Sequence, residues 1–180
     1  MSETVLRPPV LPAVYDTTRW SGRVLSVLDH VTMVLLLVSV ATMVGVVSVQ
    51  VLLRYGFNMS LDWAEEISRL AFVWSIFLAI PLGVRQGAHI GIDVVINQFP
   101  PAVQTALRRI AAALSAAMML AIAWAALGVA REQWDELMTS LDWSVGWFIV
   151  PVGLSALLSG LHLVRITIEG PPLAVPGAAE

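Results

Sequence analysis

Charged residues of both signs gather in one short stretch of the chain. Glu65 lies four residues before Arg69 and Glu66 lies three residues before it, so on a helix either carboxylate could pair with this guanidinium. Arg54 precedes the stretch and could join the cluster across a turn. Two interpretations stay open: ordinary pairing at lipid headgroups, or an acidic surface on which a soluble partner docks.

Other reactive combinations are missing from the sequence. With no Cys, the chain has no disulfide, thiolate nucleophile or Cys-ligated metal. There is no Ser/His/Asp arrangement, Gly-rich phosphate loop or carboxylate pair inside an apolar segment. His30 and His162 could approach one another, but a membrane cytochrome needs axial histidines on facing helices, and no second pair exists. We therefore expect no enzyme, bound cofactor or metal.

The elements that must position the charged stretch are strongly apolar. The chain has 180 residues, of which 58% are hydrophobic and 13% charged, against about 25% charged in a soluble domain; its mean hydropathy is +0.81. A span needs ~20 apolar residues to cross ~30 Å of hydrocarbon. The pattern predicts an all-α membrane protein, and the net charge of −3 disfavours a nucleic-acid partner. Four transmembrane helices are expected, forming two hairpins, at about 31–53, 62–84, 110–130 and 145–164.

The distribution of Arg predicts the orientation of this single four-helix domain, 31–164. Loops on the acidic side contain Arg54 and Arg131, with Arg69 just inside the second span. We expect no cleavable signal in the N-terminal segment 1–30. The other seven Arg lie in this segment, in the middle loop and in the tail 165–180, so both termini are expected in the cytoplasm. In the middle loop, Ile92, Val95 and Phe99 share one face, which predicts a short interfacial helix. Trp63, Trp134, Trp143 and Trp147 are interpreted as interface anchors, and Trp74 and Trp124 as deeper packing residues.

Small residues recur at helical spacing in three of the predicted spans. Such stripes let helix backbones approach closely in lipid, either within the four helices or against another subunit. Pro81 and Pro151 lie inside spans, where each is expected to kink its helix. The stripes are Ala71, Ser75, Ala79 and Gly83 in the second span; Ala113, Ala117, Ala121 and Ala125 in the third; and Gly153, Ala156 and Gly160 in the fourth.

A four-residue sequence, Ser-Leu-Asp-Trp, occurs twice, at 60–63 and at 140–143. In the first copy, Asp62 and Glu65 resemble a capping box at a helix start. The repeat is compatible with a duplicated hairpin or with two independent occurrences of a cap followed by an anchor.

Three segments together resemble a known family, the DctQ-like small membrane subunit of tripartite ATP-independent periplasmic (TRAP) transporters. They are Val51–Asn58 with Leu61–Arg69, Arg85–Asp93, and Ile149–Gly153. By this resemblance, structural or interface roles are implied for residues that match recurring positions of the motifs. These residues are Arg54, Glu66, Arg69, Gly87, His89 and Asp93. Further interface or structural candidates within the three segments are Asp62, Glu65, Arg85, Pro151 and Gly153.

The resemblance implies a non-catalytic scaffold in a three-part importer of the bacterial inner membrane. A periplasmic binding protein would capture a small organic acid, and a large multi-span subunit would move it by an elevator mechanism coupled to an ion gradient, usually of Na⁺. The cation would bind in the large subunit rather than here. The alternatives are a stand-alone four-helix carrier or channel, which the lack of charged residues within the first, third and fourth spans disfavours, and a haem or quinone membrane anchor.

Overall fold

The computed structural model describes residues 20–85 and 100–169. Each of its four long helices is long and apolar enough to cross a membrane. In this part of the chain there is no β-strand beyond one isolated bridge, between Leu137 and Ser144. The prediction of an all-helical membrane protein with four spans is confirmed. The helices are α1 (Trp20–Gly56), α2 (Asp62–Arg85), α4 (Pro101–Glu132) and α5 (Val150–Glu169), and a 3-10 turn, η1 (Val145–Phe148), precedes α5.

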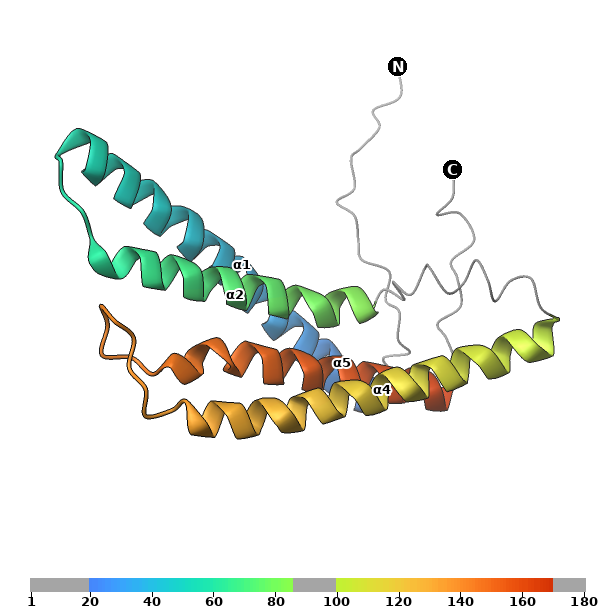
Figure 1. Cartoon of the computed structure of the whole chain (residues 1–180). Coiled ribbons are helices and arrows are strands. Elements are labelled where there is room, and N and C mark those ends of the chain that lie inside the picture. Colours follow the sequence, from blue (N-terminus) through green and yellow to red (C-terminus); the bar gives the residue numbers. More distant parts are fainter. Residues whose placement is uncertain (1–19, 86–99, 170–180) are drawn as a thin grey trace, which may run out of the picture.

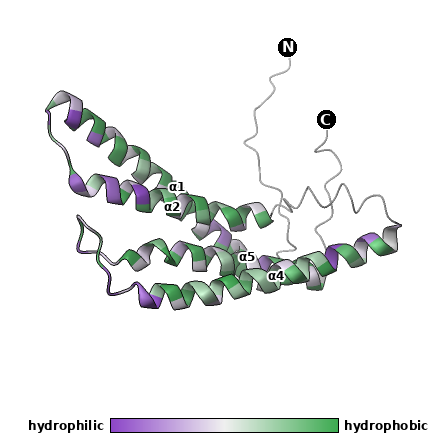
Figure 2. Cartoon of the chain, viewed as in Figure 1, coloured by the Kyte–Doolittle hydropathy of each residue, from purple (hydrophilic) through white to green (hydrophobic). Residues whose placement is uncertain are grey.

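The helices pack in the spatial order α1, α2, α5, α4 (Figure 1). Of the most apolar part of α5, 44% is buried inside the chain, against 6% for α1, so α5 is the central helix and α1 an outer one. The α1–α2 loop, residues 57–61, and the α4–α5 loop, residues 133–144, lie at one end, called here the loop end (Figure 1). Apolar residues cover the helices, while hydrophilic ones gather at the loop end and near the opposite end (Figure 2).

Helix α1 is longer than the predicted span at both ends. It begins at Trp20 rather than at Val31, and its 37 residues correspond to about 55 Å of helix. Hydropathy marks only the part of a helix suited to hydrocarbon, whereas backbone hydrogen bonding continues through polar residues until a breaker is reached. Residues 20–30, expected as a separate cytoplasmic segment, are therefore part of the helix.

Pro151 does not interrupt a helix, so the predicted kink there is wrong. The predicted fourth span is divided into η1 and α5, and Pro151 lies in the first turn of α5, where its missing N–H removes no helical hydrogen bond. Its side chain is fully buried. Pro81, in contrast, lies inside α2 as expected and is also buried.

The small-residue stripes have different surroundings. In α5, a Cβ on Gly153 would lie 3.4 Å from Ala126 Cβ, and one on Gly160 would lie 3.1 Å from Leu120 Cδ2, so these glycines lie against α4. Ala71 of α2 is buried, but Ala79 is exposed and a Cβ on Gly83 would meet open space. For α4, the interpretation as internal packing is wrong. The predicted residues Ala113, Ala117, Ala121 and Ala125 are exposed, and the buried ones are Ala112, Ala116, Ala123 and Ala126.

Candidate functional surface at the loop end

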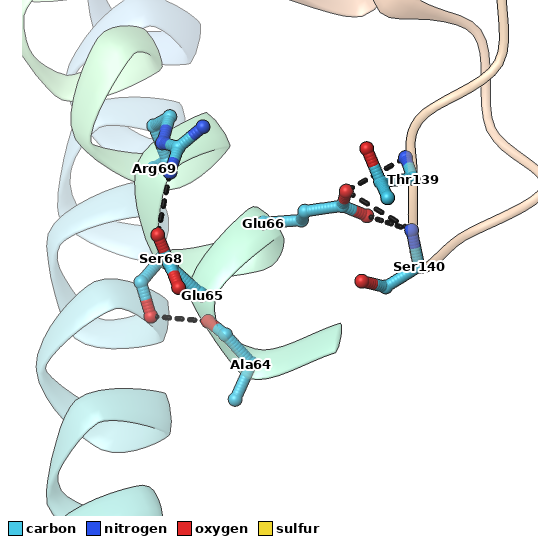
Figure 3. Close-up of polar contacts among 7 residues, drawn as sticks. All are labelled: Ala64, Glu65, Glu66, Ser68, Arg69, Thr139 and Ser140. Atoms are coloured by element: carbon cyan, nitrogen blue, oxygen red, sulfur yellow. Dashed lines mark hydrogen bonds and ion pairs between the residues drawn. The ribbon is translucent and has the colours of Figure 1, made fainter. Parts of the chain in front are cut away.

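Glu66 joins α2 to the α4–α5 loop. Its Oε1 accepts the backbone N–H of Thr139 at 2.8 Å and that of Ser140 at 3.0 Å, and its Oε2 accepts the Ser140 N–H at 3.0 Å (Figure 3). Hydrogen bonds to an ionised acceptor are about twice as strong as neutral ones. The half-buried carboxylate therefore holds the loop against the first turns of α2.

The predicted charge cluster is divided between two sides of α2. Arg69 Nη2 lies 2.6 Å from Glu65 Oε1, with the two side chains 62% and 72% exposed, while the Glu66 carboxylate extends to the loop (Figure 3). Exposed pairs of this kind contribute about 0–1 kcal/mol, so this pair is weak as a stabilising contact. Arg54 is exposed in the last turn of α1, and within the described residues it forms no ion pair with this group.

The α4–α5 loop has an internal structure of its own. The N–H of Met138 donates to the Trp143 carbonyl at 2.8 Å, and the N–H of Val145 donates to the Glu136 carbonyl at 2.8 Å. Ser144 caps η1, because its Oγ accepts the Gly146 N–H at 3.0 Å. These bonds give the loop a defined shape beside Glu66.

The two Ser-Leu-Asp-Trp copies therefore have different roles. The first copy begins a helix: Asp62 and Glu65 lie in the first turn of α2, and the Ser60 hydroxyl lies 3.5 Å from Asp62 Oδ1. The second copy lies inside the loop and ends before the cap, which Ser144 supplies. The local structures do not match as a duplicated hairpin would require.

Three tryptophans connect the loop to the helices. The Trp147 ring centroid lies 6.3 Å from that of Trp74 on α2 and 5.9 Å from that of Trp134, and Trp74 Nε1–H donates to the Trp147 carbonyl at 3.1 Å. A Cβ on Gly146 would lie 2.8 Å from Trp134 Cε3, so only glycine fits there without displacing the ring. Trp74 is a packing residue as expected, but Trp124 is 80% exposed, and its interpretation as internal packing is wrong.

A buried polar pair at the opposite end was missed by the sequence analysis. His162 Nε2 of α5 lies 2.9 Å from Asp29 Oδ1 of α1, and both side chains are at least 95% buried. Thr32, one turn after Asp29, and Arg165, one turn after His162, are buried too. The predicted first span began at Val31, so Asp29 was counted outside it. Polar residues repeated at i and i+3 on two apolar helices were the signal that could have found the pair.

Other predicted residues lie partly or wholly outside the described residues. Arg85 is the last residue of α2, while Gly87, His89, Asp93 and the predicted interfacial helix belong to 86–99. His30 is exposed rather than facing His162. Among the residues that the structure describes, no group of three or more His, Cys, Asp or Glu could hold a metal ion.

Four helices that are each long and apolar enough to cross a membrane define a multi-pass membrane protein. Comparison with known families is more specific. Residues 43–170 match the model of the DctQ component of tripartite ATP-independent periplasmic transporters. The chain belongs to this family and is a TRAP transporter small permease subunit. Because the family consists of transporter permease subunits, which are not catalytic, this subunit is not an enzyme.

Individual relatives agree with this assignment. A TRAP small permease protein of Haemophilus influenzae is 36% identical over 41% of this chain and 47% of its own. The C4-dicarboxylate small permease DctQ of Vibrio cholerae is 29% identical over 69% of this chain and 52% of its own. The isethionate permease DctMQ of Oleidesulfovibrio alaskensis is 24% identical over 58% of this chain and 16% of its own. The chain spans about half the length of the first two relatives.

Proposed function

We propose that this subunit is a static scaffold for a large multi-span permease subunit of a TRAP-type secondary transporter in the bacterial inner membrane. One observation carries the proposal: most residues in the apolar parts of the helices are not buried inside the chain. Of the most apolar 18-residue stretch, only 6% is buried in α1 and 22% in α4. Among the described residues, the buried ionisable side chains lie at one end rather than along a central pathway. This pattern favours a scaffold over a carrier, which would need a substrate pathway of its own.

The partner proposal is supported by one relative in particular. The match in DctMQ covers only 16% of that protein, whose name describes it as a TRAP transporter permease, so a region like this chain occurs inside a much longer chain. We therefore propose that the large subunit moves the substrate and holds the coupling ion, expected to be Na⁺, while this chain binds no cofactor.

The substrate is proposed to be a small organic acid, a carboxylate in the first instance. Two relatives are named for C4-dicarboxylate and for isethionate, both small organic anions. Their names differ although this chain resembles both. Selectivity is therefore assigned to the other components of the transporter.

The helices are proposed to form two hairpins with both termini in the cytoplasm, which places the loop end in the periplasm. Of the described acidic residues at this end, Glu66 is used internally and the others are exposed. They would form part of the docking surface for a periplasmic substrate-binding protein that carries basic residues. The exposed acids are Asp62, Glu65, Glu132, Asp135, Glu136 and Asp142.

Co-expression with a large TRAP permease subunit from the same organism tests the scaffold role. We expect the two chains to co-purify, and proteoliposomes to take up labelled dicarboxylate only when the large subunit and the binding protein are also present. Liposomes containing this chain alone should show no uptake above empty liposomes. Uptake by the lone chain would instead identify a stand-alone carrier.

A further inference from the structure

Helix α1 contacts the rest of the chain along one narrow stripe. Its buried and half-buried residues are spaced alternately by four and three positions, with only Leu28 beside them; the other residues from Arg23 to Gly56 are exposed. A spacing averaging 3.5 residues is the heptad pattern of a left-handed helix crossing. The stripe consists of Leu25, Asp29, Thr32, Leu36, Ser39, Met43, Val46, Gln50 and Leu53.

Such a stripe defines which face of α1 contacts the other helices, but it does not define the position of α1 along its own axis, called here its register. Displacing α1 by seven residues, about 10 Å along the helix, would place an equivalent row of side chains on α2. In lipid the burial of apolar side chains does not favour one register, because lipid tails are as apolar as the partner helix. A feature that occurs once along the stripe is needed to select one position.

Asp29 is that feature. It is the only acidic or basic residue of the stripe, and it is buried where α1 meets α5, with its Oδ1 2.9 Å from His162 Nε2. Displacement of α1 by one heptad would separate these groups by about 10 Å. It would also take from the Asp29 carboxylate and the His162 imidazole the hydrogen bond that they share, and separating the partners of a buried polar pair is strongly unfavourable. This free-energy penalty raises the energy of the displaced positions of α1 and not that of the observed position.

We propose that the Asp29–His162 pair is a register lock that fixes the axial position of α1 against α5. The pair discriminates between positions of α1 more than it stabilises the fold, as single buried polar residues do in heptad interfaces. The neighbouring buried residues Thr32 and Arg165 continue the same two helix faces by one turn, and the Thr32 hydroxyl donates to the Leu28 carbonyl of its own helix. The lock is a property of this chain and does not depend on the proposed scaffold role.

Distances between spin labels on the full-length chain in lipid nanodiscs test the proposal. The chain has no Cys, so Val44→Cys on α1 and Leu157→Cys on α5, both at exposed positions, attach labels only there. With the native pair we expect one narrow distance distribution. In the D29L/H162L background we expect a broad or two-peaked distribution, although the midpoint of thermal unfolding stays within about 5 °C, because well-packed apolar residues can replace a buried pair.

The exchanged variant D29H/H162D and a surface control complete the test. The exchange keeps both groups and should restore the single narrow distance, whereas E65Q, which breaks the exposed pair with Arg69, should change neither the distance nor the midpoint. An unchanged narrow distance in D29L/H162L would overturn the proposal. A D29L/H162L variant that fails to fold would also overturn it, because the pair would then be needed for stability. A broad distance distribution in the exchanged variant would overturn it as well.

Discussion

At the scale of single residues, two adjacent glutamates show how position decides the role of a carboxylate. Successive residues of an α-helix are rotated by about 100°, so Glu65 and Glu66 leave α2 in different directions. Glu65 pairs with Arg69 on the exposed surface of α2, where such a contact is weak. Glu66 instead accepts N–H groups from Thr139 and Ser140, more than 70 residues away in the sequence. Nothing in the local sequence distinguishes the two, because the partner of Glu66 is the backbone of a distant loop.

The first prediction concerns this loop anchor. In Glu66→Gln, one carboxylate oxygen becomes an amide NH₂ group, which cannot accept a hydrogen bond and faces the Ser140 N–H. We expect amide hydrogen exchange at Thr139 and Ser140 to accelerate about tenfold, the equivalent of ~1.4 kcal/mol. The matched variant Glu65→Gln should leave exchange at these two amides within about twofold. Equal protection in wild type and Glu66→Gln would show that other contacts hold the loop.

At the scale of elements, the sequence predicted the number and type of the helices but not all of their contact faces. Four apolar segments of sufficient length leave few alternatives in a bilayer, so their existence follows from hydropathy. Hydropathy does not distinguish a lipid-facing alanine from a protein-facing one. Helix α4 contains enough alanines for several stripes, and the predicted one through Ala113 and Ala117 is exposed, while Ala112 and Ala116 are buried. The close packing at Gly146 of η1 was missed because the side chain that it meets, Trp134, lies 12 residues earlier in the α4–α5 loop.

The second prediction uses two adjacent alanines on α4. Ala116 is 5% exposed, so Ala116→Leu must insert a large side chain into the internal packing. We expect the free energy of unfolding of the isolated subunit to fall by about 1–3 kcal/mol and its thermal midpoint by several degrees. Ala117 is exposed, and Ala117→Leu should leave that midpoint unchanged. If this face of α4 meets the large subunit, the yield of co-purified complex should fall about tenfold in Ala117→Leu. An unchanged yield would assign this face to lipid.

The other face with open small residues can be tested in the same way on α2. Ala79 is exposed and Ala71 is buried on the same helix. Ala79→Leu should reduce the yield of complex without lowering the stability of the isolated subunit, while Ala71→Leu should lower the stability itself. Thermal unfolding of the subunit and the amount of large subunit recovered with it separate the two effects. A reduced yield with only one of Ala79→Leu and Ala117→Leu would identify which helix faces the partner.

At the scale of the whole molecule, charge and packing divide the subunit into two ends with different properties. At the loop end, six exposed acidic residues outnumber the three exposed arginines Arg54, Arg69 and Arg131, on a surface made rigid by Glu66 and the tryptophans. At the opposite end, some charged side chains such as Arg109 are exposed, but Asp29 and His162 are buried between helices. The loop end thus presents mostly acidic side chains, whereas the opposite end contains a buried polar pair that connects α1 to α5.

This asymmetry leads to a prediction about docking that depends on ionic strength. If the loop end receives a binding protein with basic residues, Glu65→Lys combined with Asp135→Lys should weaken binding about threefold to tenfold in surface plasmon resonance at low salt, mainly through a slower association rate. The difference should shrink in 0.5 M salt, because a Debye length of about 4–5 Å screens exposed charges. Arg109→Gln, an exposed charge at the opposite end, is the control and should leave the affinity unchanged. Equal affinities for the double variant and the wild type at low salt would place the docking surface elsewhere on the transporter.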